Sequence, residues 1–262
     1  MLRTATTTRY VMPLREGGSL PAIVEADDDG LYVIKFRGAG QGPKALIAEL
    51  VAGEIGRTLG LPVPEIVFME LDPLLGRSEP DYEIQELIKA STGLNLALDF
   101  LPGALAFDAL DVHSGVVESA LASFILWFDA YVTNVDRTAR NTNMLWWHRR
   151  LTLIDHGASL YFHHIDGNYL ERSRTPFSSI KNHVLLPVAS ELRAVDLRAK
   201  ELLSLTVIEG IVELIPTSWL EDDPFFSDPQ ARRAAYVAYL LDRLENSHIF
   251  VEEALRARDQ LI

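Results

Sequence analysis

The chain has 262 residues, of which 48% are hydrophobic, and this is enough for a sizeable core in one large domain or two smaller lobes. Its formal net charge of −13 argues against nonspecific binding to nucleic acid or to an anionic membrane surface, because phosphate contacts require clustered Lys and Arg. Since the sequence contains no cysteine, disulfides and cysteine-ligated zinc sites are excluded.

The chain begins with MLRTATTTRYVMPLREGG, which lacks the apolar core of a signal peptide. No run of the sequence reaches membrane-spanning length. We therefore expect a cytoplasmic protein that binds neither membranes nor nucleic acid.

The first hundred residues contain sequence patterns of both strands and helices. Residues 19–36 predict a β-hairpin, because two β-rich runs flank Asp-Asp-Asp-Gly, a strong turn signal. A helix is predicted over residues 43–61, with Pro43 in its first turn and Gly60 at its end. The remaining elements expected here are strands over residues 62–71 and 93–100 and a short helix over residues 80–91.

The rest of the chain is mostly helical in pattern. The apolar spacing over residues 116–132 predicts a buried helix, and residues 144–155 predict a second hairpin. Further helices are expected over residues 188–215 and 229–258. The predicted fold is therefore α+β with two lobes and a cleft between them: a strand-rich N-lobe over residues 1–103 and a mostly helical C-lobe over residues 104–262.

Three oxygen-bearing residues lie around the second hairpin at a spacing that suits phosphoryl transfer. Asp136 and Asn141 are five residues apart in NVDRTARNTNMLWW, and Asp155 follows nineteen residues after Asp136 in LTLIDHGASL. One turn of loop lets Asp136 and Asn141 face one point, and the hairpin brings Asp155 back beside them. The pattern predicts Asp136 as catalytic base and Asn141 and Asp155 as Mg²⁺ ligands, since hard oxygen donors suit that ion.

A second group of residues in the N-terminal third predicts a phosphate site. Lys35 lies in the hydrophobic strand YVIKF, and a buried Lys needs a partner. Glu49 on the next helix is the expected partner, with Glu54 as its competitor one turn later; the pair would aim the ammonium at the phosphates of ATP. The residues Gly17, Gly18 and Ser19 in REGGS offer a turn that could cover these phosphates.

Two other classes of site are weakly supported. His163 and His164 are adjacent, so on a strand they would point to opposite faces and could not easily share a zinc ion. No Gly-x-Ser-x-Gly elbow is present, which disfavours a serine hydrolase.

The residues above resemble the HipA-like kinase family, an atypical branch of the protein-kinase-like fold that is related in its active-site pattern to phosphatidylinositol kinases. The resemblance covers about residues 17–162, and its most specific segments are AELVAGEIGRTLGLPVPE and NVDRTARNTNML with LIDHGASL. It implies Lys35 as phosphate-binding lysine with Glu49 as its partner, Asp136 as catalytic base, and Asn141 and Asp155 as magnesium ligands. It also implies that adenine binds near a hinge formed by Asp99, Phe100 and Leu101.

The sequence departs from the family pattern in three ways. Thr138 stands where related loops often have His, and His156 stands where Asp-Phe-Gly has Phe, a change expected to affect packing more than charge. The N-terminal subdomain of full-length toxin kinases is also missing from the pattern, which puts a toxin role and an antitoxin partner in doubt.

The expected reaction is transfer of the γ-phosphoryl group of ATP to a hydroxyl in the presence of Mg²⁺. By resemblance the acceptor is a protein Ser or Thr, with autophosphorylation included. Two alternatives stay open: a small-molecule kinase of the aminoglycoside or choline type, which the acidic composition would suit, and a nucleotide-binding pseudokinase that acts as an interaction module.

Overall fold

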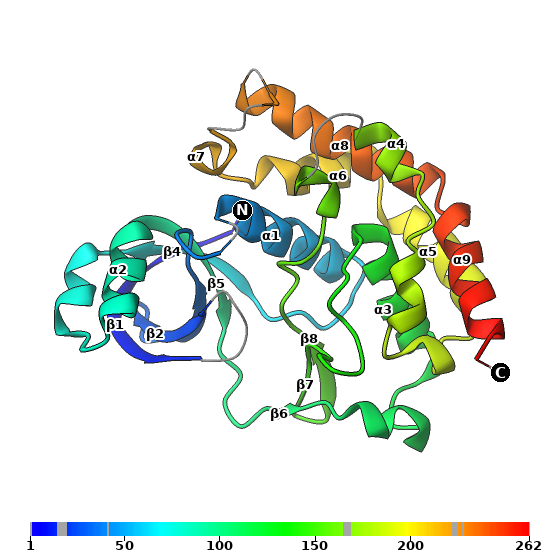
Figure 1. Cartoon of the computed structure of the whole chain (residues 1–262), viewed down its shortest axis with the longest axis horizontal. Helices are drawn as coiled ribbons and strands as arrows, with labels where there is room; N and C mark the ends of the chain where they lie inside the picture. Colours follow the sequence, from blue (N-terminus) through cyan, green and yellow to red (C-terminus); the bar gives the residue numbers. More distant parts are fainter. Residues whose placement is uncertain are drawn as a thin grey trace.

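The computed structural model describes residues 2–14, 20–40, 42–164, 169–221, 225–226 and 228–261. It is an α+β structure in which strands dominate the first part and helices the second (Figure 1). The strands are β1 (Thr4–Pro13), β2 (Ala22–Ala26), β3 (Leu31–Lys35), β4 (Ile66–Leu71), β5 (Gly93–Asp99), β6 (Leu105–Ala106), β7 (Met144–Trp147) and β8 (Arg150–Leu153).

The helices follow the predicted order, with short additions between them. The α-helices are α1 (Pro43–Thr58), α2 (Tyr82–Ala90), α3 (Ser119–Val132), α4 (Tyr169–Ser173), α5 (Leu192–Leu202), α6 (Leu205–Glu213), α7 (Thr217–Leu220), α8 (Pro229–Glu245) and α9 (His248–Asp259). The short 3-10 helices are η1 (Pro73–Ser78), η2 (Ala109–Ser114), η3 (Tyr161–His164), η4 (Ser178–Asn182) and η5 (Leu186–Val188). Within the described residues, no helix combines the length and the apolar character needed to cross a membrane.

Five strands close into a barrel in the order β1-β2-β3-β5-β4. The predicted hairpin is β2 and β3, which pair antiparallel with Ala22 opposite Ile34. The barrel closes because β1 also pairs in parallel with β4, which places Thr4 opposite Phe68. The sequence analysis assigned no strand to β1, whose side chains are mostly exposed and give little alternation.

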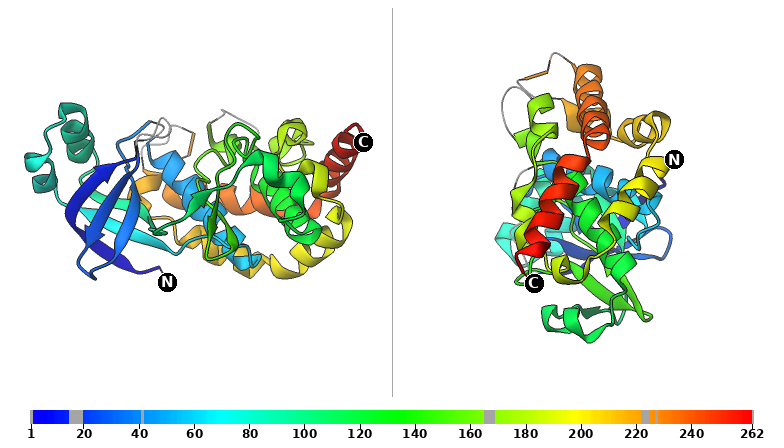
Figure 2. Two further views of the ribbon diagram at one scale, coloured as in Figure 1. Left: turned by 90° about the horizontal axis from the view of Figure 1, so that it is seen from below. Right: turned by 90° about the vertical axis from the view of Figure 1, so that its right-hand side faces the viewer.

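The two faces of the barrel strands contribute to different cores, as the two-residue period of a strand requires. Val67 and Ala97 point into the barrel, where α2 adds Ile84 and Ile88 to the same cluster. Leu96, next to Ala97 on β5, belongs instead to the larger core outside the barrel. Figure 2 shows the barrel at one end of an elongated molecule and the C-terminal helices at the other.

Helix α1 lies between the barrel and the C-terminal helices (Figure 1). Pro43 fits its first turn because that position needs no backbone N–H donor. The helix packs against β4 and β5 on one side and against α6 and α7 on the other. Its apolar residues therefore join the large core together with α3, α5, α8 and α9.

A second, small sheet of order β6-β7-β8 contains the other predicted hairpin. β7 and β8 pair antiparallel with Met144 opposite Leu153. β6, which the sequence analysis did not predict, pairs with β7. The loop between α3 and β7 enters this sheet at the end where β8 leaves it, so residues 133–143 and the residues after Leu153 are neighbours.

Candidate active site

Lys35 and Glu49 form the ion pair that the sequence predicts. Lys35 is the last residue of β3, and its Nζ atom lies 2.7 Å from Oε2 of Glu49 on α1. The Glu49 side chain is completely buried, and that of Lys35 is 12% exposed. The competing Glu54 instead pairs with Arg57 on its own helix, at 3.2 Å.

Asp155 joins this pair from a distant part of the chain. Its Oδ1 atom lies 2.5 Å from Nζ of Lys35, although 120 residues separate the two. Asp155 follows β8 with a φ of 56°, in the left-handed region that Asp tolerates better than most residues but that still costs on the order of 1 kcal/mol. Such a conformation directs the Asp155 carboxylate towards Lys35 rather than along the strand.

Lys35 and Glu49 are held in their charged forms. Burial opposes the charge of Lys35, but the carboxylates of Glu49 and Asp155 outweigh it and raise the pKa of Lys35 above its usual value. Burial likewise opposes the charge of Glu49, but Lys35 and His156 lower the pKa of that carboxyl well below its usual range. The site therefore holds a buried, ionised cation between two carboxylates.

His156 provides a second connection between Asp155 and helix α1. Its backbone N–H donates to Oε2 of Glu49 at 2.9 Å, and its ring Nδ1 lies 3.3 Å from Oε1 of the same carboxylate. The buried ring also packs edge-on against Phe128, with ring centroids 5.6 Å apart. The expectation that this histidine affects packing more than charge is therefore incomplete, since its ring lies beside a buried carboxylate.

Asp136 and Asn141 lie on a loop that folds back on itself. The backbone N–H of Asp136 donates to the side chain of Asn134 at 3.1 Å. Thr138 and Asn141 exchange backbone hydrogen bonds of 2.9 and 3.2 Å, which close the turn between them. The turn leaves the side chains of Asp136 and Asn141 exposed.

The loop and Asp155 meet at one end of the β7–β8 hairpin. Beyond the paired strands, the N–H of Ile154 donates to the carbonyl of Asn143 at 3.0 Å. Asp155 follows Ile154 directly, and Asn141 precedes Asn143 by two residues. Partial desolvation, and then the negative charge of Asp155, raise the pKa of Asp136. The arrangement therefore brings the carboxylates of Asp136 and Asp155 close together at the same edge of the hairpin, with Asn141 on the same loop as Asp136.

A buried hydrogen-bond network around Asp129 holds the loop that carries Asp136 in place. The Nε atom of Arg137 donates to Asp129 of α3 at 2.6 Å, and Arg137 also donates to the carbonyl of Asn143. Asp129 receives two more hydrogen bonds, from Asn134 at 2.9 Å and His183 at 2.9 Å. Burial opposes its charge, but Arg137 and His183 lower the pKa of Asp129 to about 2. Arg137 is therefore held in a structural ion pair with Asp129.

The sequence analysis missed Asp129, although one signal was available. It is a single carboxylate in the otherwise apolar run FILWFDAYV, and a buried charge of this kind requires a partner.

The predicted hinge residues lie at the end of β5. The N–H of Asp99 donates to the carbonyl of Glu65 at 2.9 Å, and that of Phe100 donates to Leu31 at 3.0 Å, while Leu101 is buried. Burial, and then Glu65, raise the pKa of Asp99. On the neighbouring strand, Tyr32 pairs with Asp99 and Lys35 with Leu96, so Lys35 lies three residues, or about 10 Å, from the expected hinge.

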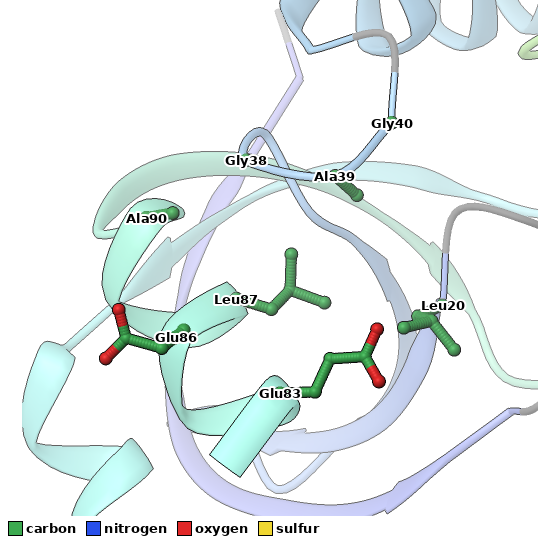
Figure 3. Close-up of a pocket in the computed structure, with 8 residues that line it drawn as sticks. All are labelled: Leu20, Gly38, Ala39, Gly40, Glu83, Glu86, Leu87 and Ala90. Atoms are coloured by element: carbon green, nitrogen blue, oxygen red, sulfur yellow. The ribbon is translucent and has the colours of Figure 1, made fainter.

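The other predicted residues can be placed only in part. Gly17, Gly18 and Ser19 lie outside the described residues. A hollow of about 350 Å³ opens nearby, lined by Glu83, Glu86 and Leu87 of α2 and by the loop after β3 (Figure 3). None of the predicted site residues that the structure describes lines it, and we place the candidate site at Lys35 and Asp155 instead because Lys35 meets carboxylates from two distant segments there.

The two adjacent histidines differ from the strand geometry assumed for them. They lie on the 3-10 helix η3, where Nε2 of His163 is 3.1 Å from Nε2 of His164. His163 also contacts the hydroxyl of Tyr236 at 2.8 Å, and the ammonium of Lys44 donates to its carbonyl. Burial and then the charges of His164 and Lys44 lower the pKa of His163, so neutral rings that share a hydrogen bond account for the contact.

The donor set at the hairpin edge fits a hard divalent cation. Asp155 offers a carboxylate and Asn141 an amide oxygen, and Mg²⁺ commonly takes one or two protein oxygens together with phosphates and water. No cluster of three or more His, Asp or Glu residues suited to a metal occurs among the described residues. A nucleotide would therefore have to complete the ligand set.

Known proteins resemble this chain in sequence family and in fold. A sequence model for HipA-like kinases matches residues 8–253. Similar solved structures include a proinflammatory kinase, CtkA, of Helicobacter pylori, with 13% identity, full coverage of both chains and a TM-score of 0.54. The Golgi casein kinase with Mn and ADP bound has 11% identity and a TM-score of 0.53, covering 96% of this chain and 74% of the other. Among curated proteins, no sequence matches.

Proposed function

Because the chain belongs to the HipA-like kinase family, we propose that it transfers the γ-phosphoryl group of ATP to a protein Ser or Thr hydroxyl with the help of Mg²⁺. The observation that carries the proposal is the contact of Lys35 with both Glu49 and Asp155. Two segments separated by more than a hundred residues supply a cation and a carboxylate to one point, beside a loop that carries Asp136.

Each residue has a proposed task. Lys35, held by Glu49, binds the α- and β-phosphates of ATP, since a buried ammonium needs anionic partners. Asp155 and Asn141 hold Mg²⁺, which neutralises charge on the phosphates. We assign adenine to the region of Asp99, Phe100 and Leu101, and phosphate cover to the segment with Gly17, Gly18 and Ser19.

Asp136 is the proposed base of the transfer step. It accepts the proton of the acceptor hydroxyl while the oxygen forms a bond to the γ-phosphorus. The bond between that phosphorus and the β–γ bridging oxygen breaks, and ADP leaves with the electron pair. A raised pKa supports this role, because a carboxylate of higher basicity accepts a proton more readily.

We interpret residues 1–103 and 104–262 as the two lobes of a kinase, with the nucleotide between them. The barrel and α1 would supply the phosphate-binding residues, and the hairpin and its loop would supply the base and metal ligands. The larger core, which extends from the barrel face through α1 into the C-terminal helices, would limit how far the lobes move apart.

For the acceptor we favour a protein over a small molecule. The Golgi casein kinase, a structural neighbour, is named for a protein substrate, casein. Autophosphorylation would need no other partner. The pseudokinase alternative predicts nucleotide binding without transfer.

The test is transfer of labelled γ-phosphate from ATP by the purified protein, with and without Mg²⁺. Acceptors would include the protein itself, casein and an aminoglycoside. We expect labelled Ser or Thr that depends on Mg²⁺ and is absent in Asp155→Asn. Asp111→Asn, at an exposed aspartate of η2, serves as the matched control. ATP binding without transfer to any of these acceptors would favour the pseudokinase.

A further inference from the structure

A second hollow, of about 650 Å³, opens beside the loop that carries Asp136. Thr133 and Val135 line one side of it, and Val135 directly precedes Asp136 in the chain. The lining also includes the segment after α4, with Thr175 and Phe177. Because Val135 precedes Asp136, a group bound here would lie close to the proposed base.

The lining is apolar and aromatic, with hydroxyl groups among the rings. Tyr161 is 55% exposed and Val135 39% exposed, so both side chains offer accessible apolar surface to the hollow. At its base, Phe162 stacks on Tyr239 with ring centroids 3.8 Å apart. A surface of this kind suits a bulky apolar or aromatic side chain.

The charge of the lining is opposite to that of the whole protein. The chain carries a net charge of −13, yet among the described residues that line this hollow the charged one is Arg172 and none is a carboxylate. The neighbouring Arg174 forms an ion pair with Asp242, with 2.7 Å between its guanidinium nitrogen and the carboxylate oxygen. Within the described residues the guanidinium of Arg172 has no such acidic partner, so it is available to a carboxylate from outside.

The wall that carries Arg172 is held in position before anything binds. The buried Arg243 donates to the carbonyls of Ser173 at 2.7 Å and Thr175 at 3.1 Å. The same guanidinium donates to Ala130 at 2.7 Å, at the end of α3. One side chain thus connects the wall to the helix that leads into the catalytic loop, which reduces the ordering cost of binding.

On the basis of the proposed kinase function, we infer that this hollow is the acceptor pocket and that it selects a protein Ser or Thr flanked by a bulky apolar side chain and an acidic residue. The apolar side chain packs against Tyr161 and Val135, and the acidic residue pairs with Arg172. The same lining disfavours a cationic acceptor such as an aminoglycoside, because the guanidinium of Arg172 would repel it.

The test uses three fluorescent peptides that share a central Ser within a Gly-Ala framework. Their cores are Asp-Phe-Ser-Phe-Asp, Lys-Phe-Ser-Phe-Lys and Asp-Ala-Ser-Ala-Asp, so that either chain direction presents the same groups. Affinity is measured by fluorescence anisotropy, and phosphate transfer to each peptide is measured separately. We expect the first peptide to bind about tenfold more tightly than either of the others, as expected for one charged or one large apolar contact.

Two exposed positions provide the variants. Arg172→Glu should abolish or invert the preference for Asp over Lys, and Tyr161→Ala should abolish the preference for Phe over Ala. Arg193→Glu, the same charge change on α5, should alter neither ratio. An unchanged Asp-to-Lys ratio in Arg172→Glu, or tightest binding of the Lys peptide by the unmodified protein, would overturn the inference.

The two readouts separate this inference from the proposed function. Selective binding without phosphate transfer would support the pocket and contradict the kinase reaction. Transfer to all three peptides with equal affinity and rate would support the kinase reaction and contradict the pocket.

Discussion

At the scale of single residues, Glu49 connects the parts of the candidate active site. Its buried carboxylate meets the ammonium of Lys35, the backbone N–H of His156 and the ring of His156. Helix α1, strand β3 and the segment after β8 are therefore held by one side chain. The sequence predicted the contact with Lys35 because a Lys in an apolar strand needs a partner. The contacts with His156 could not be predicted, since they depend on how β8 is placed against α1.

The Lys35–Glu49 pair allows a double-mutant test of its own. Lys35→Met leaves Glu49 buried without its cation, so we expect the free energy of unfolding to fall by about 3 kcal/mol. Lys35→Met combined with Glu49→Gln should recover part of that loss, because the fully buried carboxylate is no longer left without a cation, but should not recover ATP binding. Urea denaturation and calorimetric titration with ATP measure the two effects. Equal stability of Lys35→Met and the unmodified protein would contradict the ion pair.

His163 should make stability depend on pH between 5 and 7. Its pKa in the folded protein is lowered well below the unfolded value of about 6.5, first by burial and then by His164 and Lys44. Unfolding therefore takes up a proton at acid pH, and stability that is complete above about pH 7 declines as the pH falls through 6.5. If His163 takes up no proton in the folded protein over this range, the free energy of unfolding should fall by about 2 kcal/mol between pH 7 and pH 5.

The measurement is the free energy of unfolding at several pH values for the unmodified protein and for His163→Gln. We expect the variant to show a shallower slope below pH 6.5. His148→Gln, at an exposed histidine of the β7–β8 turn, should keep the original slope. Identical slopes for all three proteins would show that His163 titrates normally in the folded state.

At the scale of elements, the catalytic loop owes its shape to helix α3. Asp129 receives hydrogen bonds from Asn134 and Arg137, in the first half of the loop, and from His183, which follows η4. The loop contains no regular structure of its own between α3 and β7. A buried, ionised carboxylate thus replaces the support that strand or helix hydrogen bonds would give.

Asp129→Ala should loosen this loop selectively. Arg137 would remain buried without its partner, and we expect a loss of about 3 kcal/mol or more in stability together with faster hydrogen exchange over residues 134–143. Phosphate transfer should fall more than ATP affinity does, because Asp136 loses its position while Lys35 keeps its own. Asp111→Asn is the control. Unchanged exchange over residues 134–143 would contradict the role given to Asp129.

The elements themselves show what local sequence can and cannot specify. The hairpin of β2 and β3 follows from its Asp-Asp-Asp-Gly turn, and α1 follows from Pro43 and its apolar pattern, so both were predicted. β1 was missed because its stability comes from pairing with β2 and β4, and not from an apolar pattern of its own. β6 was missed for the same reason, since two residues become a strand only beside β7.

At the scale of the whole molecule, the large core brings the predicted site residues together. Lys35 and Asp155 are far apart in the chain, and they meet because α1 packs on the barrel and on the C-terminal helices at once. The sequence predicted that these two residues serve one site, and the structure places them in contact. The distances within the site could not be predicted, because they depend on the placement of the barrel relative to the β7–β8 hairpin.

The central claim is that Asp136 accepts the proton of the acceptor hydroxyl, and it is tested most directly by the rate of phosphate transfer in Asp136→Asn. The substitution removes the proton acceptor but keeps the size of the side chain, so ATP binding by Lys35 and Asp155 should be preserved. We predict a loss of transfer of at least about a hundredfold, as for other general bases, with ATP affinity within a factor of about three. Transfer by Asp136→Asn at the rate of the unmodified protein would contradict the account.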